Sequence, residues 1–506
     1  MRYQNPIIPG YNPDPTICRV GEDYYIMNSS FEFFPGVPIY HSRNLANWTL
    51  KGYCLTRESQ LNLSECHPSG GIYAPTLRSH NGRFYMTTTN VTFGGNFIVT
   101  SDDILGQWSE PVWVDQEGID PSLLFDDDGK VYYCTAVFEP EREGIYLSEI
   151  NPDTGEKLTE TVCITKGCGG RYAEGPHMYK LWGKYYLMLA EGGTEYGHYE
   201  TMMRASSPYG PFEQCPHNPI LSHVNRMKDD IQCTGHADIV EDHNHNWWMV
   251  CLGIRQTMTP KNRVLLHNLG RETFLAPVVW TKDGWPVVGY EGSLELSMEG
   301  PLPSEAYQTD WSFFDDFSSE EPSSQYNYIR NPVAENYQRL AKEQVLRLTG
   351  TDMTLSHRAS PTFLGVRQRE FETITTVTLS APCKDDRQCA GLTAFYNEGY
   401  HYDILLTKQD GQDRICLRKQ VHDILTITAS HAISYAGSVE LQIISDRKDY
   451  RFLYRVDGGE FIELGRGCVA GLCTEGTQTM SFTGTYLGMF CENTVADFRL
   501  FRAQII

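Results

Sequence analysis

No apolar run in the 506-residue chain is long enough to span a membrane. The opening residues, Met1 to Pro6, also lack the apolar core of a signal peptide. The sequence as it stands therefore predicts neither a membrane span nor export, and we expect a cytoplasmic location.

Positive charge is scarce: 42 lysines and arginines stand against 64 aspartates and glutamates, which gives a formal net charge of −22. A chain this acidic repels the phosphates of nucleic acids and of anionic membranes, so both are excluded as partners. A neutral ligand such as a sugar suits this charge, whereas a polyphosphate does not.

Cysteine pairs with the Cys-x-x-Cys spacing of metal and redox sites are missing, although the chain has 15 cysteines. Because that number is odd and the cysteines are scattered, we predict that most are reduced and buried. Neither disulfides nor a zinc site is expected to hold the fold together.

Sustained helical periodicity is missing as well, and no tryptophan follows Trp311. After a proline-rich, polar stretch at 300–309, short β-branched and aromatic runs alternate with polar turns up to Ile506. This pattern predicts an all-β chain with a first domain over residues 1–300 and a second over residues 312–506. The second domain is expected to be an antiparallel, jelly-roll-like β-sandwich.

The first domain contains a repeat. A proline-marked anchor, a short apolar run, a turn and an aromatic run follow one another from residues 14, 74, 120 and 174, and more loosely from residue 235. The spacings between Pro15, Pro75, Pro121 and Pro176 are 60, 46 and 55 residues, and Ala237 follows 61 residues later. Spacings of this size are typical of four-stranded blades, so the five repeats predict a five-bladed β-propeller.

A third strand is expected after each hairpin of the repeat. The candidate third strands are residues 38–42, 97–101, 144–148, 202–206 and 264–268. The first strand of each blade should line the central channel.

Three of the five anchors carry a carboxylate: Asp14, Asp120 and Glu174. The other two carry Ala74 and His236. A single Asp-Pro pair is usually a turn, but three acids at the same position of a repeat indicate a shared site. If the first strands start at the same end of the channel, the three side chains converge on one mouth.

Two other polar clusters are interpreted as turns. Residues 126–129 resemble a fragment of a calcium-binding loop, and residues 243–245 contain two histidines. Both clusters occupy the hairpin turn of their repeat, which favours a turn over a metal site.

Three converging carboxylates suit glycoside hydrolysis. One carboxylic acid protonates the leaving oxygen, and one carboxylate acts on the opposite face of the sugar. A third carboxylate can raise the pKa of the acid by repulsion, which keeps the acid protonated near neutral pH.

Further motifs surround the anchors and extend into the second domain. They are residues 12–16, 30–36, 118–122, 173–177, 190–194, 235–238, 269–273 and 482–488. In this order they resemble family 43 of the glycoside hydrolases, and more narrowly its two-domain β-xylosidases. The resemblance covers nearly the whole chain and implies a β-propeller whose active site is closed by a β-sandwich.

The resemblance also implies roles for single residues. Asp14 matches the general base, Glu174 the general acid, and Asp120 the group that tunes and orients the acid. Five further residues match a substrate-binding pocket: Phe31, Tyr73, Thr194, His236 and Arg271.

Within this pocket, Thr194 and His236 are expected on the floor, and Arg271 is expected to bridge sugar hydroxyls and the carboxylates. Tyr73 stands where this group usually has a tryptophan, which predicts a wall that forms hydrogen bonds as well as stacking. The sandwich loop continues through residues 488–492 without the small residue and aspartate usual in the group. Both departures bear on substrate choice.

These features predict an exo-acting β-xylosidase that releases xylose from the non-reducing end of β-1,4-xylo-oligosaccharides. Asp14 and Glu174 belong to the first and fourth repeats, across the channel, which predicts the separation of about 6.5–9.5 Å of an inverting pair. The nearest alternative is an α-L-arabinofuranosidase, since the two sugars present similar hydroxyls. A non-catalytic sugar-binding propeller is the other alternative, although three acids in register would then be superfluous.

Acid–base hydrolysis demands no cofactor. Some members of the family hold calcium in the central channel near the fifth-blade histidine, so a structural calcium is an option here. Similar enzymes are commonly dimers or tetramers, so a homo-oligomer is an option too.

Overall fold

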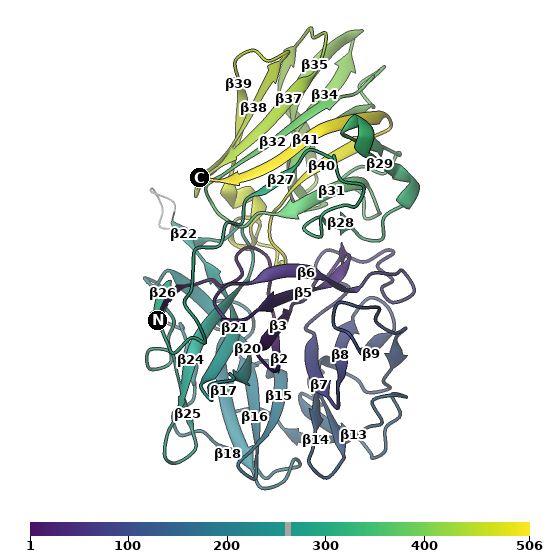
Figure 1. Ribbon diagram of the computed structural model, residues 1–506. Helices are drawn as coiled ribbons and strands as arrows, with labels where there is room; N and C mark the ends of the chain where they lie inside the picture. The colour runs from purple at the N-terminus through teal and green to yellow at the C-terminus, as the bar shows by residue number, and fades with distance from the viewer. Residues whose placement is uncertain (259–264) are drawn as a thin grey trace.

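The computed structural model describes residues 1–258 and 265–506, and almost all of its regular structure is β-strand (Figure 1). The N-terminal part forms small sheets around a channel, and the C-terminal part forms a β-sandwich that lies against one side of them. Within these residues no helix has the length and apolar character needed to cross a membrane.

Each sequence repeat forms one antiparallel sheet of four main strands. The strands, blade by blade, are β2 (Thr16–Val20), β3 (Asp23–Met27), β5 (Gly36–Ser42) and β6 (Thr49–Leu55); β7 (Thr76–His80), β8 (Arg83–Asn90), β9 (Gly95–Ser101) and β10 (Val112–Trp113); β11 (Ile119–Phe125), β12 (Val131–Val137), β13 (Gly144–Glu149) and β14 (Val162–Thr165); β15 (Glu174–Leu181), β16 (Lys184–Glu191), β17 (Tyr199–Ala205) and β18 (Glu213–Gln214), with β19 (Leu221–Ser222) also on β17; and β20 (Ile231–Glu241), β21 (Trp247–Arg255), β24 (Glu272–Trp280) and β25 (Pro286–Val288).

The first strands of the blades form a closed ring. Strand β2 contacts β7 and β20, β11 contacts β7 and β15, and β15 contacts β20. The predicted five-bladed β-propeller is therefore confirmed. The N-terminal strand β1 (Arg2–Gln4) pairs with β26 (Ser297–Glu299), which joins the two ends of this part of the chain.

Four of the five predicted third strands are correct, and the fifth is wrong. Val264 lies outside the described residues, and Leu265–Leu266 forms β23, which pairs with β22 (Thr257–Met258) outside the blade. The third strand of the last blade is β24 instead. The reason is tertiary: Leu266 is 1% exposed and packs into the core of the sandwich, so this segment serves the domain contact.

Both polar clusters that we interpreted as turns are confirmed as hairpin turns. The backbone nitrogen of Asp126 donates to the carbonyl of Lys130 at 2.9 Å, and that of Asp242 donates to the carbonyl of Asn246 at 2.7 Å. The Asp126 carboxylate is bound by the side chains of Lys180 and Tyr185, so it is occupied by protein groups.

The sandwich consists of an eight-stranded and a six-stranded antiparallel sheet. The larger sheet contains β27 (Phe313–Asp315), β29 (Tyr337–Leu340), β30 (Val345–Thr349), β32 (Thr373–Ser380), β37 (Val439–Ser445), β38 (Asp449–Val456), β39 (Ile462–Cys468) and β41 (Val495–Ile505). The smaller sheet contains β31 (Thr362–Arg367), β33 (Cys389–Asn397), β34 (Tyr400–Gln409), β35 (Gln412–Val421), β36 (Ile424–Ala432) and β40 (Tyr486–Glu492).

Helical structure is limited to short turns. They are η1 (Ala334–Asn336), η2 (Ala341–Glu343), η3 (Val469–Leu472) and α1 (Thr474–Thr477). The predicted all-β fold with a C-terminal sandwich is therefore confirmed.

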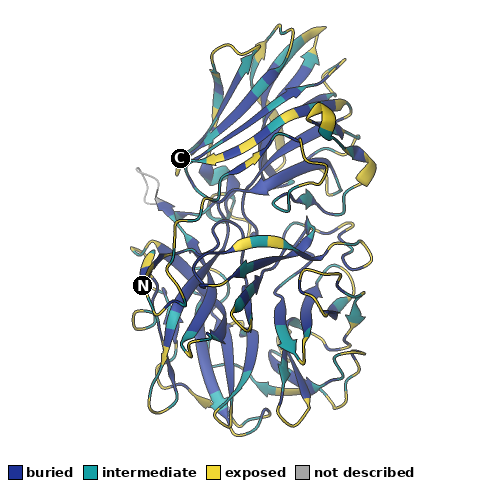
Figure 2. Cartoon of the chain, in the orientation of Figure 1, coloured by how far each residue is buried: buried dark blue, intermediate teal, exposed yellow. Residues whose placement is uncertain are grey.

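Within the six-stranded sheet, most residues of β31, β33, β34 and β40 are buried on both faces, whereas the edge strand β36 is mostly exposed (Figure 2). In β40, Leu487 and Met489 pack into the sandwich core, whereas Tyr486 and Phe490 face a second cluster that includes Phe31 of the propeller. Successive side chains of a strand point to opposite faces. One strand therefore serves both the sandwich core and the contact with the propeller.

A short strand pair also crosses between the two parts. Strand β28 (Tyr328–Ile329) of the sandwich segment pairs with β4 (Phe33–Phe34) of the propeller. None of the 15 cysteines is paired with another, and 12 of them are buried, which agrees with the predicted burial.

Candidate active site

The three predicted carboxylates line a single pocket of about 350 Å³ at the starts of the channel strands. All eight residues singled out from the sequence line this pocket: Asp14, Phe31, Tyr73, Asp120, Glu174, Thr194, His236 and Arg271. The repeat therefore brings together residues that lie up to 257 positions apart in the chain.

The backbone bends where the channel strands begin. Asp14, Asp120 and His236 have φ values of 50°, 53° and 47°, and Gly175 has a φ value of 57°. In β11, β15 and β20 the pairing register shifts at the same places, which marks β-bulges. Non-glycine residues rarely adopt positive φ, and bulges change the direction of a side chain. These bends, and not a regular pleat, set the direction of the acids.

Asp14 is held by three side chains. Its Oδ1 accepts a hydrogen bond from Arg271 Nη1 at 3.0 Å and lies 3.7 Å from His236 Nδ1. Its Oδ2 accepts from Ser29 Oγ at 2.5 Å. Burial raises the pKa of Asp14, but Arg271, His236 and the Ser29 hydroxyl outweigh burial and keep the pKa below its ordinary value. Asp14 is therefore ionised at neutral pH and can accept a proton.

Asp120 has the opposite electrostatic surroundings. It is 6% exposed, and its Oδ2 accepts one hydrogen bond, from the backbone nitrogen of Gly175 at 3.2 Å. Burial, followed by the charges of Glu174 and Asp14, raises the pKa of Asp120 well above its ordinary value. Repulsion between nearby carboxylates favours a state in which one of them keeps its proton. The pocket thus combines an ionised carboxylate with a carboxylate pair that favours holding one proton.

Arg271 connects the floor of the pocket to the sandwich. Besides Asp14, its Nη1 contacts Thr194 Oγ1 at 2.9 Å, and its Nη2 donates to the carbonyl of Phe482 at 3.2 Å. The guanidinium also lies 5.7 Å from the ring centroid of Phe31 and 5.2 Å from that of Phe482. The guanidinium is favourably placed between these two aromatic rings. Of the three pocket carboxylates, it directly binds Asp14 alone.

Three aromatic side chains form one wall of the pocket. The ring centroids of Phe31 and Tyr73 are 5.2 Å apart, and Phe482 lies 5.6 Å and 5.8 Å from them. Burial raises the pKa of Tyr73 to about 12, so its hydroxyl stays protonated. Within residues 1–258 and 265–506 no other group is hydrogen-bonded to this hydroxyl, and Tyr73 lines the pocket, so the hydroxyl is available to a ligand. That it does so remains a prediction.

The sandwich reaches the pocket through the loop after α1. Met480 and Phe482 line the pocket. The backbone nitrogen of Phe482 donates to Ser69 Oγ at 2.9 Å, while its carbonyl accepts from Arg271. One residue of the sandwich is therefore fixed by two propeller side chains.

Sequence reasoning missed six other lining residues. They are Ile119, Phe138, Tyr172, Gly193, Glu195 and Met480. The rings of Phe138 and Tyr172 meet edge to face with centroids 5.9 Å apart. Four of them had a usable signal, because each lies within two positions of a predicted site residue: Ile119, Tyr172, Gly193 and Glu195. Phe138 and Met480 belong to no repeat position and to none of the quoted motifs.

Further along the channel strands, Asp238 forms an ion pair with Arg78. Its carboxylate accepts hydrogen bonds from Arg78 at 2.9 Å, Tyr179 at 2.6 Å and Thr16 at 2.8 Å. Burial raises the pKa of Asp238, but Arg78 and His177 outweigh burial and hold it far below its ordinary value.

This arrangement does not fit a channel calcium. The guanidinium of Arg78 already supplies the positive charge beside Asp238, and a second cation would be repelled. In the described part of the chain, no group of three or more His, Cys, Asp or Glu side chains could hold a metal ion. The optional calcium near His236 therefore finds no support in the donor set.

Two sequence families match the chain. The family described as Glycosyl hydrolases family 43 matches residues 3–286. The family described as Beta xylosidase C-terminal Concanavalin A-like domain matches residues 314–504. The first range covers the propeller strands up to β25, and the second covers most of the sandwich.

Single proteins match over most of the chain. The non-reducing end alpha-L-arabinofuranosidase BoGH43B of Bacteroides ovatus is 40% identical over 498 residues, 97% of this chain and 91% of that protein. A xylosidase/arabinosidase of Butyrivibrio fibrisolvens is 40% identical over 80% of each chain. The crystal structure of a xylan beta-1,4-xylosidase from Bacillus halodurans C-125 superposes with a TM-score of 0.91 at 31% identity, over 99% of this chain and 100% of that one.

Proposed function

This chain belongs to glycosyl hydrolase family 43, and from this premise we propose that it removes one terminal pentose at a time from the non-reducing end of an oligosaccharide. The first substrate we propose is a β-1,4-linked xylo-oligosaccharide, with xylose as the product. The observation that carries this proposal is the pocket itself, in which three carboxylates meet a wall supplied by a second domain. A walled pocket accepts the end of a sugar chain and excludes its interior.

Three roles follow from the environments of the acids. Asp14 is the general base, because its partners keep it ionised. It takes a proton from a water molecule, whose oxygen then bonds to the anomeric carbon while the bond to the leaving oxygen breaks. Glu174 is the general acid that gives its proton to that leaving oxygen. Asp120 orients this acid, since it binds the backbone of Gly175 directly after it and favours a shared proton by repulsion.

Five further residues bind the sugar in this proposal. Phe31 and Tyr73 stack against the sugar ring, and Thr194 and His236 contact it from the floor. Arg271 donates to Asp14 and offers its remaining N–H groups to sugar hydroxyls.

The reaction proceeds by a single displacement with inversion. Asp14 and Glu174 lie at the starts of the first and fourth blades, which suits the wide separation that leaves room for a water. Proton NMR during the first minutes of hydrolysis should show α-xylose appearing from a β-linked substrate before mutarotation. If β-xylose appeared first, Asp14 would be a nucleophile.

Release of α-L-arabinofuranose is the second candidate activity. It is favoured by the names of two relatives that are each 40% identical to this chain, an arabinofuranosidase and a xylosidase/arabinosidase. The two pentoses present similar hydroxyls, and none of the pocket contacts described above discriminates between them.

Parallel assays test these proposals. The purified protein is incubated with xylobiose, an aryl β-xyloside and an aryl α-L-arabinofuranoside, and the Asp14→Asn variant is the control for contaminating hydrolases. We expect release of single pentoses, with the ratio of kcat/KM values ranking the two activities. Sugar binding without turnover by the folded protein would favour the non-catalytic alternative and overturn the proposal.

The domain division is also a proposal. We take residues 1–300 as the catalytic propeller and residues 312–506 as the sandwich that closes its pocket, supported by Met480 and Phe482 in the pocket wall. A protein that ends near residue 311, stays folded and still hydrolyses xylobiose at the normal rate would contradict this division of labour.

A further inference from the structure

His198 is a buried histidine with no role in the mechanism above. It directly precedes β17, and its side chain is 0% exposed. Its Nδ1 lies 3.2 Å from the carbonyl oxygen of Cys233 on β20, and its Nε2 lies 3.4 Å from Oε1 of Glu174. The imidazole therefore stands between a channel strand and the proposed acid.

The Cys233 carbonyl determines the tautomer of this ring. A carbonyl oxygen only accepts hydrogen bonds, so Nδ1 carries the hydrogen. In a neutral imidazole the other nitrogen, Nε2, is then an acceptor. This Nε2 is buried and has no regular hydrogen bond within the described residues, with Glu174 Oε1 beside it. A carboxyl group satisfies a buried acceptor only when the carboxyl is protonated.

Gly235 on β20 makes room for the ring. A Cβ atom at this position would lie 2.5 Å from Cε1 of His198 and 2.7 Å from its Nδ1, which is closer than real Cβ atoms approach. The next residue, His236, lines the pocket. A glycine at the strand bend therefore lets one histidine stand behind the acid while its neighbour faces the sugar site.

Most titratable groups around the imidazole are uncharged. Glu200 on β17 is buried, and burial raises its pKa well above the ordinary value, which favours its protonated form. Burial likewise raises the pKa of the Cys233 thiol and lowers that of His236, which keeps both neutral. Asp14 is ionised but is already bound by Arg271, and that guanidinium disfavours a second cation nearby.

We infer that His198 is a positioning residue for the acid: its neutral Nε2 accepts a hydrogen bond from the protonated carboxyl of Glu174. This inference rests on the proposed role of Glu174 as general acid. The contact holds the proton at Oε1 and fixes the carboxyl rotamer until the leaving oxygen takes the proton. After the transfer, the ionised carboxylate faces the Nε2 lone pair, and this repulsion favours return of a proton from solvent before the next turnover.

Two variants separate this role from a packing role. In His198→Asn the amide can still donate to the Cys233 carbonyl, but nothing replaces Nε2 next to Glu174. In His198→Gln the longer side chain can place its amide oxygen near the position of Nε2, where it offers an acceptor. Thermal unfolding of both variants shows whether the fold is kept.

The readout is the dependence of rate on the leaving group. Both His198 variants and Glu174→Ala are assayed on two substrates of the pentose that the enzyme accepts. One is a disaccharide of this pentose, and the other is its dinitrophenyl glycoside, whose leaving group needs no proton. We expect the kcat of His198→Asn to fall about tenfold more on the disaccharide than on the dinitrophenyl glycoside. General acid catalysis as a whole contributes about 10²–10⁴-fold, and the contact with His198 accounts for only a part of it. The alkaline limb of its pH–rate profile should also move to lower pH. His198→Gln should recover most of the difference.

The outcomes distinguish this inference from the proposed function. If Glu174→Ala shows no dependence on the leaving group, the acid assignment fails and the inference fails with it. If Glu174→Ala discriminates between the substrates but folded His198→Asn loses both activities equally, the role of His198 alone is overturned. If the Asn variant does not fold, equal losses on both substrates for folded His198→Gln would overturn it in the same way.

Discussion

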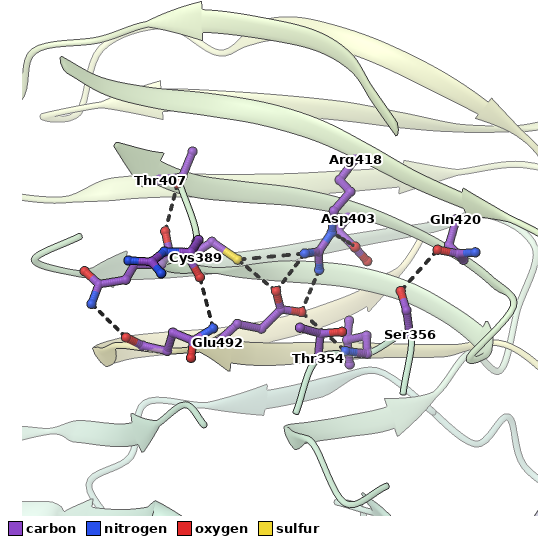
Figure 3. Close-up of polar contacts among 12 residues, drawn as sticks. Thr354, Ser356, Cys389, Asp403, Thr407, Arg418, Gln420 and Glu492 are labelled. Atoms are coloured by element: carbon purple, nitrogen blue, oxygen red, sulfur yellow. Dashed lines mark hydrogen bonds and ion pairs between the residues drawn. The ribbon is translucent and has the colours of Figure 1, made fainter. Parts of the chain in front are cut away.

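The candidate active-site pocket and the six-stranded sheet of the sandwich each contain a buried cluster of carboxylates, but only the cluster in the sandwich is fully paired. In the sandwich, Arg418 donates two hydrogen bonds of 2.7 Å to Glu492 and a third of 2.7 Å to Asp403 (Figure 3). Asp403 also accepts from His401 Nδ1 at 2.9 Å and from Thr393 Oγ1 at 2.7 Å.

The two clusters differ in the direction of their pKa shifts. Burial raises the pKa of Asp403, but His401 and Arg418 outweigh burial and hold it far below its ordinary value. In the pocket, Arg271 binds Asp14 only, and the pKa of Asp120 is raised. Both environments are buried, so burial by itself does not mark a catalytic acid. A deficit of cationic partners distinguishes the pocket instead, because it favours a state in which the carboxylate pair keeps a proton.

The strongest test of this contrast is Glu174→Ala. We expect a loss of about 10²–10⁴-fold in kcat on a disaccharide, since the alcohol leaving group needs a proton, and a much smaller loss on a dinitrophenyl glycoside. Glu195→Ala is the matched control, because Glu195 also lines the pocket but lies outside the repeat. Its effect should be smaller and equal on both substrates. A Glu174→Ala enzyme that loses both activities equally would mean that the acid is misassigned.

In the sandwich, Arg418→Met should reduce stability and leave catalysis intact. The change strands Asp403 and Glu492 as buried charges, which costs about 3–5 kcal/mol. Chemical denaturation followed by a probe in the sandwich measures this loss, and kcat per folded molecule should not change. The control Arg347→Met removes a pair with Asp497 that is 42% and 23% exposed, and should cost less than about 1 kcal/mol. Equal losses for the two variants would show that the buried cluster contributes no more than a surface pair.

Arg271→Gln tests the pairing of Asp14 through pH. Folding lowers the pKa of Asp14 below its ordinary value of 3.8. Ionised Asp14 therefore stabilises the folded protein at pH values above the pKa that Asp14 has in the unfolded chain. This stabilisation is lost as the pH falls through the pKa that Asp14 has in the folded protein. Without the guanidinium, burial dominates, and the pKa of Asp14 should rise. The acid limb of the kcat/KM profile should therefore move to higher pH. If the acid limb did not move, the group that titrates in this limb would not be Asp14, and Asp14 would not be the general base.

The smallest expected effect concerns the loop that joins the two parts. Glu475 on α1 accepts hydrogen bonds from Tyr196 at 2.8 Å and from His267 Nδ1 at 2.5 Å. Tyr196 lies two residues after Thr194, and His267 lies four residues before Arg271. One sandwich carboxylate thus fastens two segments that carry pocket residues.

Glu475→Gln should loosen this attachment at a cost of about 1 kcal/mol, seen as a roughly fivefold rise in KM with little change in kcat. The control is Glu370→Gln, which removes another ion pair between the two parts, 2.7 Å from Arg255, whose second partner Glu272 remains. KM values that rise equally in both variants would attribute the effect to general weakening of the interface.

Much of the site was predictable because it follows a repeat. Pro15, Pro121 and Pro176 mark equivalent positions, so the sequence alone assigns Asp14, Asp120 and Glu174 to one mouth. The fifth repeat is looser, and there the prediction of the third strand was wrong, since Leu266 is claimed by the sandwich core. Lining residues such as Phe138 and Met480 gave no signal, because their positions follow from loop geometry and not from a periodic pattern.

The sequence by itself determined the number of blades, the β-character of both parts and which three carboxylates line the pocket, because these depend on local patterns that recur along the chain. Only the tertiary structure decided how the acids differ. Asp14 and Asp120 occupy equivalent positions with the same positive φ, yet one pKa is lowered and the other raised. The reason is that a pKa depends on charges and burial that distant segments contribute. The partner of Asp14 is Arg271, which lies 257 residues further along the chain, and no local pattern encodes which acid receives that partner.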